Sequence, residues 1–595
     1  MNAKLKGILH TGWNEPRRFF LWLALFSICG FAAALKGAAL IGPKGFFAFV
    51  AVAAGLCFVL SILASVLAWI PPVRRLLAWL LRRRFLVLGC LATLVALFYT
   101  IENWRGRQAW QAYKRDREAK GERFDLLSLA RAPVPDDQNF FETPLWSDLH
   151  YFEKDGDTIW SDTNHDSHVI FDVFGPASMK APNASSWPVG RSVDLAAWQA
   201  YYRSTNNVFA APGGPPTNYF PVAKEPQTPA ADVLLALSKF KGNRQLLIEA
   251  AARPQARFWV NYNAGEAMLL PHLPRVKASE QYLALHATAA LKAGDRETAM
   301  EDVKLTFRLL DSIRGEPILI AHLVRAASLF LTLGPVWEGL ADRQWTEPDL
   351  RTIERELDKL DFLADYESAM LGERACNLWA IDYVRREGIQ GLEELGHEDS
   401  DVADRDRAAG LAGLEEFLRW ALFRLIPGGW FDQNKLFSCR LYEKYTLPAV
   451  DQERRLVALT VVQESDKMGK ELEVRSPYRF LASYLVPTMA RAAQKCAAGQ
   501  TYADLARVAC ALERYRLANG QFPETLEALA PKFLEQLPHD IINGQPLKYH
   551  RTEDGQFVLY SVGWNETDDG GKIALTKSGS YDPNHGDWVW RYPAR

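Results

Sequence analysis

The residues that could do chemistry in this chain are carboxylates and imidazoles that gather in short runs. The first run reads "DTIWSDTNHDSH" and contains Asp157, Asp162, His165, Asp166 and His168. Carboxylate oxygens and imidazole nitrogens bind metals when they converge in a defined geometry. Because these five residues follow no helical or strand period, we interpret the run as a solvated polar loop rather than a metal site.

No catalytic motif accompanies such runs. The sequence contains no HExxH, GxSxG or GxGxxG pattern, and "GHEDSDVADRDR" (396–407) is a charge run that fits a solvated linker. The glycines of "GAALIGPKG" (37–45) are spaced almost as in a phosphate-binding loop, but the Gly-Lys-Ser/Thr ending is missing. A protein without enzymatic activity is the favoured interpretation. An enzyme whose site assembles from distant residues stays open.

Three uncharged apolar stretches, Phe19–Leu35, Gly45–Ile70 and Phe85–Ile101, are long enough to be transmembrane helices. A helix needs about 20 apolar residues, with a range of about 17–25, to cross a bilayer. The first 123 residues hold 18 Lys and Arg against 5 Asp and Glu, although the whole chain has a net charge of −2. A basic membrane segment on an acidic body argues against a nucleic-acid-binding protein.

Lysine and arginine mark the cytoplasmic side of a membrane protein. They precede the first span and fill the connection between the second and third, where Arg74, Arg75, Arg82, Arg83 and Arg84 lie. We therefore expect the N-terminus in the cytoplasm and the large C-terminal body on the other side of the membrane. Basic residues after the third span, from Arg105 to Arg117, count against this orientation. The first span also reads as a signal peptide with a cleavage site near Ala32–Ala34, which would leave the body outside as well.

Beyond the membrane segment the chain changes character several times. We expect a polar stalk helix over 102–130 that ends at the prolines of "RAPVPDDQNF", then an irregular region of strands and loops over 137–230. A helical body follows over 231–475. In it, residues 278–313 predict an antiparallel helix pair that resembles a tetratricopeptide hairpin, and "TEPD" (346–349) predicts a capped helix start.

Two further expectations concern the end of that body. The stretch "GGWFDQNKLFSCRLYEKYTLP" (428–448) predicts an aromatic-rich loop between helices, of the kind that more often joins domains than binds a ligand. The seven cysteines show no CxxC or zinc spacing and predict no disulfide framework.

From about residue 484 an ordered series of residues carries a resemblance. The series is Val486-Pro487, Ala511-Leu512, Tyr515-Arg516-Leu517, Asn519-Gly520, Pro523, Leu526, Leu529, Asp540, Gly544, Tyr560-Ser561-Val562-Gly563, Gly570-Gly571 and Asp587. This pattern resembles the globular part of the major pseudopilin of type II secretion systems, over roughly 110 residues. The whole chain is also similar to uncharacterised bacterial multi-pass membrane proteins that carry this tail.

Residue patterns support the same fold. Apolar residues at helical spacing from Leu505 to Leu517 predict an amphipathic helix ended by Asn519-Gly520. "LKYHR" and "FVLYSV" predict a hairpin around Glu553-Asp554-Gly555. A break of the helix at Gly499 is expected from the fresh capping pair Thr501 and Asp504. Such a break would prevent assembly into a pilus, which needs one continuous helix.

The resemblance also implies a calcium site in the loop Gly563–Trp590. In the pseudopilin family the matching loop binds calcium, and the resemblance places Asn565, Asp568 and Asp587 at suitable positions, with Asp569 and Asp582 as neighbouring alternatives. Calcium takes six to eight oxygen ligands from carboxylates, amides and carbonyls. A solvated Asp-Asp-Gly-Gly turn is the competing interpretation, because the spacing to Asp587 departs from the family's shorter loop.

Together these patterns predict a mainly α protein. Its expected parts are a membrane domain with three transmembrane helices (1–101), a stalk helix and linker (102–136), an irregular region (137–230), a helical body with tetratricopeptide-like hairpins (231–475) and an α+β pseudopilin-like domain (476–595). The expected function is that of a structural or interaction protein that contacts the lipid bilayer and envelope or secretion proteins. A periplasmic hydrolase-like enzyme, with its site where 137–230 meets the helical body, and a solute- or peptide-binding module are the alternatives.

The topology gives the first prediction. Alkaline phosphatase fused after residue 595 should be active, because the arginine cluster at 74–84 holds the second connection in the cytoplasm. A fluorescent reporter that matures only in the cytoplasm, fused at the same position, should stay dark. An inactive phosphatase together with a bright cytoplasmic reporter would reverse the orientation.

Overall fold

The fold was examined in a computed structural model of the chain. It describes residues 83–154, 157–161, 169–175, 180–182, 187–204, 208–209, 217–396, 423–464, 476–485, 490–577 and 579–593, with a few single positions between 62 and 79. The predicted spans Phe19–Leu35 and Gly45–Ile70 lie almost entirely outside the described residues. So do the glycine-containing loop 37–45, Asp162 to His168 of the first acidic run, and nearly all of the charge run 396–407.

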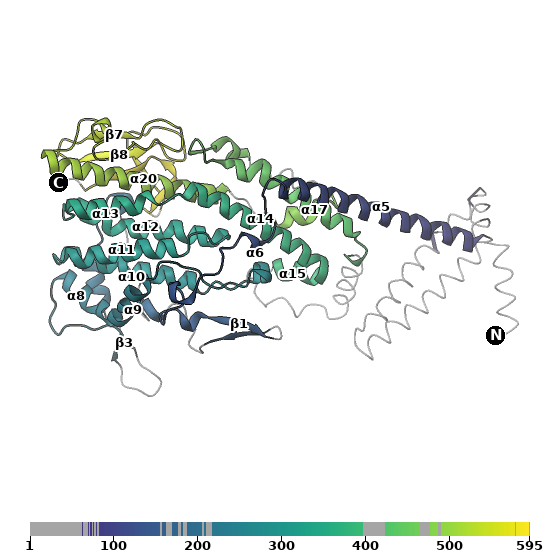
Figure 1. The fold of residues 1–595 in the computed structure, drawn as a ribbon, viewed down its shortest axis with the longest axis horizontal. Coiled ribbons are helices and arrows are strands. Elements are labelled where there is room, and N and C mark those ends of the chain that lie inside the picture. Colours follow the sequence, from purple (N-terminus) through teal and green to yellow (C-terminus); the bar gives the residue numbers. More distant parts are fainter. Residues whose placement is uncertain are drawn as a thin grey trace. The chain divides into compact units, whose positions relative to one another are not determined.

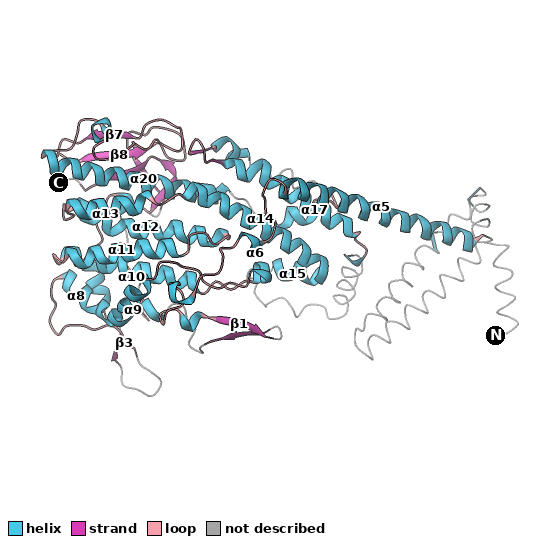
Figure 2. Ribbon diagram, in the orientation of Figure 1, coloured by secondary structure: helices cyan, strands magenta, loops and turns pink. Residues whose placement is uncertain are grey.

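The described part of the chain is mainly helical and falls into two units (Figures 1 and 2). One unit comprises Met1–Gly121, Trp379–Phe437 and Arg475–Leu485, and the other comprises Glu122–Leu378, Ser438–Val474 and Val486–Arg595. The first unit contains α5 (Arg84–Glu118), the end of α14 (Phe362–Glu387), α15 (Ile389–Gly396), most of α17 (Gly428–Leu441) and α19 (Phe480–Leu485).

Helix α5 contains the third predicted span and continues far beyond it. From Phe85 onward it has an 18-residue window with a mean hydropathy of 2.1, none of which is buried. A second helix, α12 (Leu319–Ala341), is also long and apolar enough, but 61% of its window is buried, as in the core helix of a soluble domain. Among the described residues, α5 is therefore the helix suited to crossing a membrane.

The predicted stalk helix over 102–130 is wrong in its bounds. Helix α5 carries the apolar span directly into the polar segment and ends at Glu118, well before the prolines. Gly121 follows with a φ of 90°, a backbone conformation that glycine adopts at little cost. A separate short helix, α6 (Leu126–Leu129), then begins at Asp125, whose side chain accepts a hydrogen bond from the Ser128 N–H.

The predicted aromatic loop at 428–448 is also wrong, because this stretch is helical. It forms α17, one π-helical turn η9 (Tyr442–Thr446) and a 3₁₀ turn η10 (Leu447–Ala449). Tyr442 is fully buried and its hydroxyl accepts a hydrogen bond from the Asn377 side chain at 2.9 Å. The aromatic residues of this stretch suggested a loop, but tertiary packing buries them within helices. Local propensity carries little information about such packing.

Within the described residues of 137–230, the structure has short elements and two-stranded sheets. They are η1 (Asp136–Gln138), η2 (Ser147–Leu149), η3 (Val169–Phe171), η4 (Trp187–Val189), α7 (Leu195–Tyr202) and the antiparallel pairs β1 (Tyr151–Lys154) with β2 (Asp157–Trp160) and β3 (Val208–Phe209) with β4 (Thr217–Asn218). Helix α7 follows its N-cap Asp194, whose side chain accepts from the Ala197 N–H.

The second unit is a stack of helices (Figure 1). Its helices are α8 (Pro229–Leu237), the 3₁₀ turn η6 (Ser238–Phe240), α9 (Lys241–Ala251), the 3₁₀ turn η7 (Tyr262–Ala267), α10 (His272–Lys292), α11 (Arg296–Ser312), α12, α13 (Glu347–Asp358), the start of α14, and α20 (Ala490–Asn519). Helices α10 and α11 pack together and confirm the predicted pair over 278–313. Asp295 caps α11 by accepting from the Thr298 N–H, and Thr346 and Asp349 form the predicted capping box of α13.

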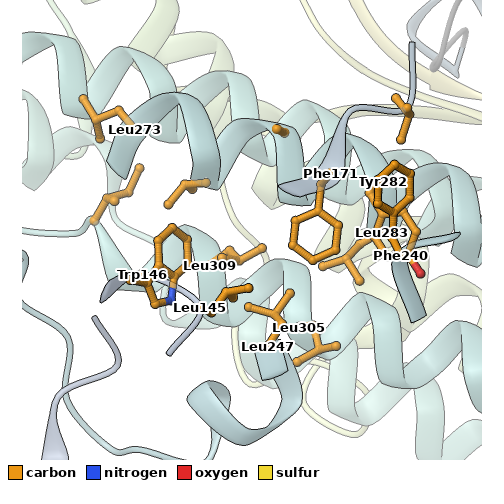
Figure 3. Close-up of a cluster of buried hydrophobic side chains, with 14 of the residues drawn as sticks. Leu145, Trp146, Phe171, Phe240, Leu247, Leu273, Tyr282, Leu283, Leu305 and Leu309 are labelled. Carbon is orange, nitrogen blue, oxygen red and sulfur yellow. The ribbon is translucent and has the colours of Figure 1, made fainter. Parts of the chain in front are cut away.

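The short elements and the helices share one hydrophobic core. Large side chains from the irregular region, among them Trp146 and Phe171, pack with Tyr282 of α10 and Leu309 of α11 (Figure 3). The ring centroids of Phe171 and Tyr282 are 4.9 Å apart. Burial of such aromatic side chains compensates for the small amount of regular structure in that region.

Helix α20 lies between the helical stack and a small sheet. It packs against α12 and α13, and also against β8 (Phe557–Ser561) and β11 (Trp588–Arg591). The sheet has the order β11-β8-β7, with β7 at Lys548–Arg551, and all pairs are antiparallel. The predicted hairpin is confirmed as β7 with β8. The 3₁₀ turn η11 (Leu526–Leu529) and the pair β9 (Ile573–Leu575) with β10 (Tyr581–Gly586) complete this region.

The predicted break at Gly499 is wrong. Helix α20 continues through it, and a Cβ at this position would lie 3.3 Å from the ring of Phe362. Gly499 therefore allows α14 to approach closely. Asp504 does not cap a new helix: its carboxylate accepts a hydrogen bond from the Gln500 side chain, one turn earlier.

Burial of α20 gives a prediction of stability. Leu512→Ala should lower the free energy of unfolding by about 2–5 kcal/mol, because Leu512 is fully buried and the substitution leaves a cavity. Leu517→Ala, on the same helix at a position 46% exposed, is the matched control and should change little. Denaturant unfolding of the detergent-solubilised full chain measures both, and equal effects would mean that α20 is not packed as described.

Candidate functional site

A polar cleft of about 340 Å³ in the second unit brings several ionisable side chains together. It lies between the end of α13, helix α20 and the segment 536–541, and a neighbouring hollow of about 450 Å³ shares Asp358, Arg507 and Gln536 with it. The charged and ionisable lining residues of the two hollows are Glu354, Arg355, Asp358, Asp361, Arg455, Asp504, Arg507, Glu535 and His539.

Local structure explains how these residues meet. Arg455 comes from the turn between β5 (Val450–Asp451) and β6 (Leu456–Val457) and has a φ of 51°, a left-handed conformation that costs a non-glycine residue about 1–2 kcal/mol. The Val457 N–H donates to the Ile541 carbonyl at 2.9 Å and fixes this hairpin to the segment that lines the cleft. His539 Nε2 lies 3.2 Å from the Arg455 carbonyl oxygen.

Asp504 is the most deeply buried acid of the cleft. Gln500 donates to its carboxylate at 3.2 Å, while the Gln500 carbonyl oxygen accepts from the Phe362 N–H at 2.9 Å. Burial raises the pKa of Asp504, and the charge of Arg507 and the hydrogen bond from Gln500 lower it by less. The protonated form of this acid is therefore favoured relative to an exposed aspartate.

The other acids of the cleft are engaged with arginines. Asp358 pairs with Arg507, and Asp361 pairs with Arg455 at 3.1 Å. In the neighbouring hollow, Glu354 pairs with Arg514 at 2.6 Å. Burial raises the pKa of Glu354 to about 7, and the charge and hydrogen bond of Arg514 lower it by less. The arrangement is better suited to exchanging these ion pairs for the charges of a bound molecule.

A second hollow lies where the irregular region meets the helical body, the place expected for an enzyme's site. It measures about 560 Å³ and is mostly apolar, with Phe174, Leu273 and Ile320 in its lining. Its one acid, Asp172, already accepts hydrogen bonds from the N–H groups of Phe174 and Gly175, each at 3.0 Å. This hollow has the character of a binding groove rather than a catalytic site.

The predicted calcium ligands and their alternatives do not form one cluster. Asn565 donates to Asp569 at 3.0 Å, and the Asp569 N–H donates to Asp587 at 3.2 Å, so these three residues lie together. Asp568 turns away and accepts from the Tyr560 hydroxyl at 3.1 Å. Asp582, the alternative, accepts from His585 at 2.9 Å if Nδ1 carries the proton. Within the described residues, no three His, Cys, Asp or Glu side chains are grouped so that they could hold a metal ion.

Asp587 has a structural role that explains its place in the resemblance. It is fully buried, and its carboxylate accepts from the N–H groups of Gly571 at 2.7 Å and Lys572 at 3.3 Å besides that of Asp569. Burial raises the pKa of Asp587 and these hydrogen bonds lower it by less. Asp540 acts in a similar way, since it is buried and accepts from Ser561 and Val562 of the sheet, each at 2.9 Å. Both carboxylates fix loops by accepting hydrogen bonds from N–H and hydroxyl groups of the chain itself.

Sequence reasoning missed the cleft. Asp504 had been interpreted as a helix cap, and Arg455, Arg507 and His539 carried no spacing that would connect them. The residues come from three separate parts of the chain, so only the packing of α20 against α13 reveals that they are neighbours. The chain matches no family model, no curated protein and no solved structure.

Calcium binding by the last loop stays a prediction, with Asn565 and Asp569 as the side chains that could still turn toward an ion. If the loop binds calcium, the thermal midpoint of the full chain should be higher with calcium than with a chelator, because a ligand that binds only the folded state stabilises it. Asp569→Asn should remove the difference, whereas Asp582→Asn should leave it. A midpoint that calcium does not change would contradict the site.

The raised pKa of Asp504 predicts a pH dependence of stability. The contribution of this residue is fully present below the ordinary pKa of aspartate, about 3.9. It is lost as the pH rises from that value through the raised pKa of the folded state. In that window the stability of the parent should fall relative to Asp504→Asn, by at most about 1.4 kcal/mol per pH unit. Parallel pH profiles of the two proteins in denaturant unfolding would contradict the shift.

Proposed function

We propose that this chain is a membrane-anchored interaction protein whose folded body binds a partner outside the cytoplasm. The observation that carries the proposal is the position of α20, which is covered by α12 and α13 on one side and by the small sheet on the other. A helix that is packed on both sides in this way is a core element of its own chain. The pseudopilin-like region is then a fixed part of a larger body and has no free helix face with which to enter a filament.

The membrane anchor rests on α5. Its apolar window is unburied, and exposed leucines such as Leu91 and Leu94 line it. An unpaired apolar helix surface of this length favours lipid over water. With the basic segments of the N-terminal region, it supports a multi-pass protein of the bacterial inner membrane whose body lies in the periplasm. Envelope or secretion proteins remain the partner class that the pseudopilin resemblance suggests.

The polar cleft is the best candidate for the binding surface. Its ion pairs Asp358–Arg507 and Asp361–Arg455 lie at a concave surface, where a partner segment with both charge signs can replace one member of each pair. The enzyme alternative needs a free acid or base positioned beside a nucleophile. Asp358 and Asp361 are engaged with arginines and Asp504 accepts a hydrogen bond from Gln500, which favours binding over catalysis.

Site-specific photo-crosslinking tests this proposal. A photoreactive residue at Gln536, which is exposed beside the cleft, should give a defined adduct with one envelope protein in native membranes, identified by mass spectrometry. The same residue at Lys304, exposed on α11, is the control and should not give it. Arg507→Gln should weaken the adduct, because it removes the positive charge with which an acidic group of the partner would pair.

Two outcomes would contradict a binding cleft. Identical adducts at positions 536 and 304 would show contact without a specific surface. No adduct at 536 in membranes that contain the full set of envelope proteins would remove the cleft from consideration, provided that the thermal midpoint of the variant equals that of the parent.

A further inference from the structure

Exposed apolar side chains in the first unit come from two distant parts of the chain. The last turns of the predicted span in α5 expose Leu94, Leu97, Phe98 and Ile101, each by about half of its surface or more. Leu425, just before α17, is 62% exposed although it comes more than three hundred residues later. The question is whether this leucine belongs to the same apolar surface.

Direct contacts place residue 425 beside the end of the span. The Tyr99 hydroxyl donates a hydrogen bond to the Leu425 carbonyl oxygen at 2.5 Å. The rings of Phe98 and Trp430 lie edge to face, with centroids 6.3 Å apart. Tyr99 is two residues before the end of the span, which corresponds to about 3 Å along a helix. Leu425 therefore lies at the level where the hydrocarbon of the bilayer would end.

The segment is held firmly at this level. The Gly429 N–H donates to the Asn103 side chain at 2.8 Å, and the backbones of Gly106 and Gly429 approach so closely that a Cβ on Gly106 would lie 2.1 Å from the Gly429 oxygen. Only glycine permits such an approach. Helices α5 and α17, both marked in Figure 1, are thus joined just beyond the end of the span.

Beyond the predicted span, charged groups on α5 begin at Glu102, one turn after Phe98. The buried carboxylate of Glu102 accepts from Trp430 Nε1 at 2.9 Å, from the Tyr478 hydroxyl at 3.1 Å and from Arg105 at 3.1 Å. Trp430 therefore has its ring against apolar Phe98 and its N–H on a carboxylate. Tryptophan and tyrosine with one apolar and one polar side are typical of the membrane–water interface.

We propose that residues 423–430 form a second contact with the membrane, in which Leu425 enters the boundary between headgroups and acyl chains beside α5. The partner is the phospholipid of the leaflet at the C-terminal end of that helix. Arg424 and Arg105 are exposed at this level, where guanidinium groups can reach lipid phosphates. The contact fixes the first unit at a defined depth and prevents α5 from tilting freely. It rests on the proposed membrane anchoring of α5.

Depth-dependent fluorescence quenching tests the contact. Single cysteines at Leu425, Leu94 and Glu118 are labelled with an environment-sensitive fluorophore in full-length protein whose Cys29, Cys57 and Cys90 are alanine. The protein is placed in nanodiscs of phosphatidylcholine and phosphatidylglycerol, with or without lipids that carry a nitroxide near the headgroup. The label at 425 should have blue-shifted emission and lose intensity with the nitroxide lipids, as the label at 94 should. Residue 118 lies about 28 Å beyond Tyr99 along α5, so its label should lose intensity only with aqueous iodide.

The controls separate the contact from the anchor. Quenching by lipid at 94 but only by iodide at 425 overturns the second contact and leaves α5 as a membrane helix. Absence of lipid quenching at 94 overturns the anchor and the contact together. A label at 425 that neither lipid nor iodide reaches lies against protein, which also overturns the contact. Each labelled protein must keep the parent's thermal midpoint. Tyr99→Phe removes the hydrogen bond to the Leu425 carbonyl oxygen and should reduce lipid quenching at 425 but not at 94.

Discussion

The enclosure of α20 is the constraint on which the folded body depends. Between Cys496 and Arg514 nearly every side chain of this helix is buried, although the helix is thirty residues long. Alanines and Gly499 line much of it, and such small side chains let α12, α13 and α14 approach closely while Tyr502 and Leu512 fill the remaining space. Two layers therefore rely on one helix: the helical stack buries one face and the sheet buries the other.

The polar cleft lies where α20 meets the end of α13 and the segment 536–541. Its ion pairs Asp358–Arg507 and Asp361–Arg455 are partly exposed, and exposed ion pairs contribute little to stability, so their presence at a concave surface suggests a different use. In the first unit the buried carboxylate of Glu102 accepts hydrogen bonds from Trp430, Tyr478 and Arg105 just outside the predicted span.

Local signals in the sequence predicted local structure well. The helix pair over 278–313, the capping box of Thr346 with Asp349 and the hairpin over 548–561 depend on neighbouring residues, and all three are confirmed. Predictions failed where packing between distant segments decides. Gly499 was interpreted as a helix break because its neighbours resemble a cap, but Phe362 from α14 occupies the space that a side chain would need. The aromatic residues at 428–448 suggested a loop, and burial makes them helical. The polar cleft had no signal at all, since His539, Arg455 and Asp504 belong to three segments.

Hydrogen exchange of the full chain in nanodiscs tests the central claim most directly. If α20 is a core element of the body, the amides of residues 496–514 should exchange only through global unfolding and be as protected as those of 283–291 in α10, which are also buried. The sheet residues 557–561 should exchange together with them. Exchange of 496–514 that is much faster than that of 283–291 would show that the C-terminal region opens as a separate domain, and it would contradict the account.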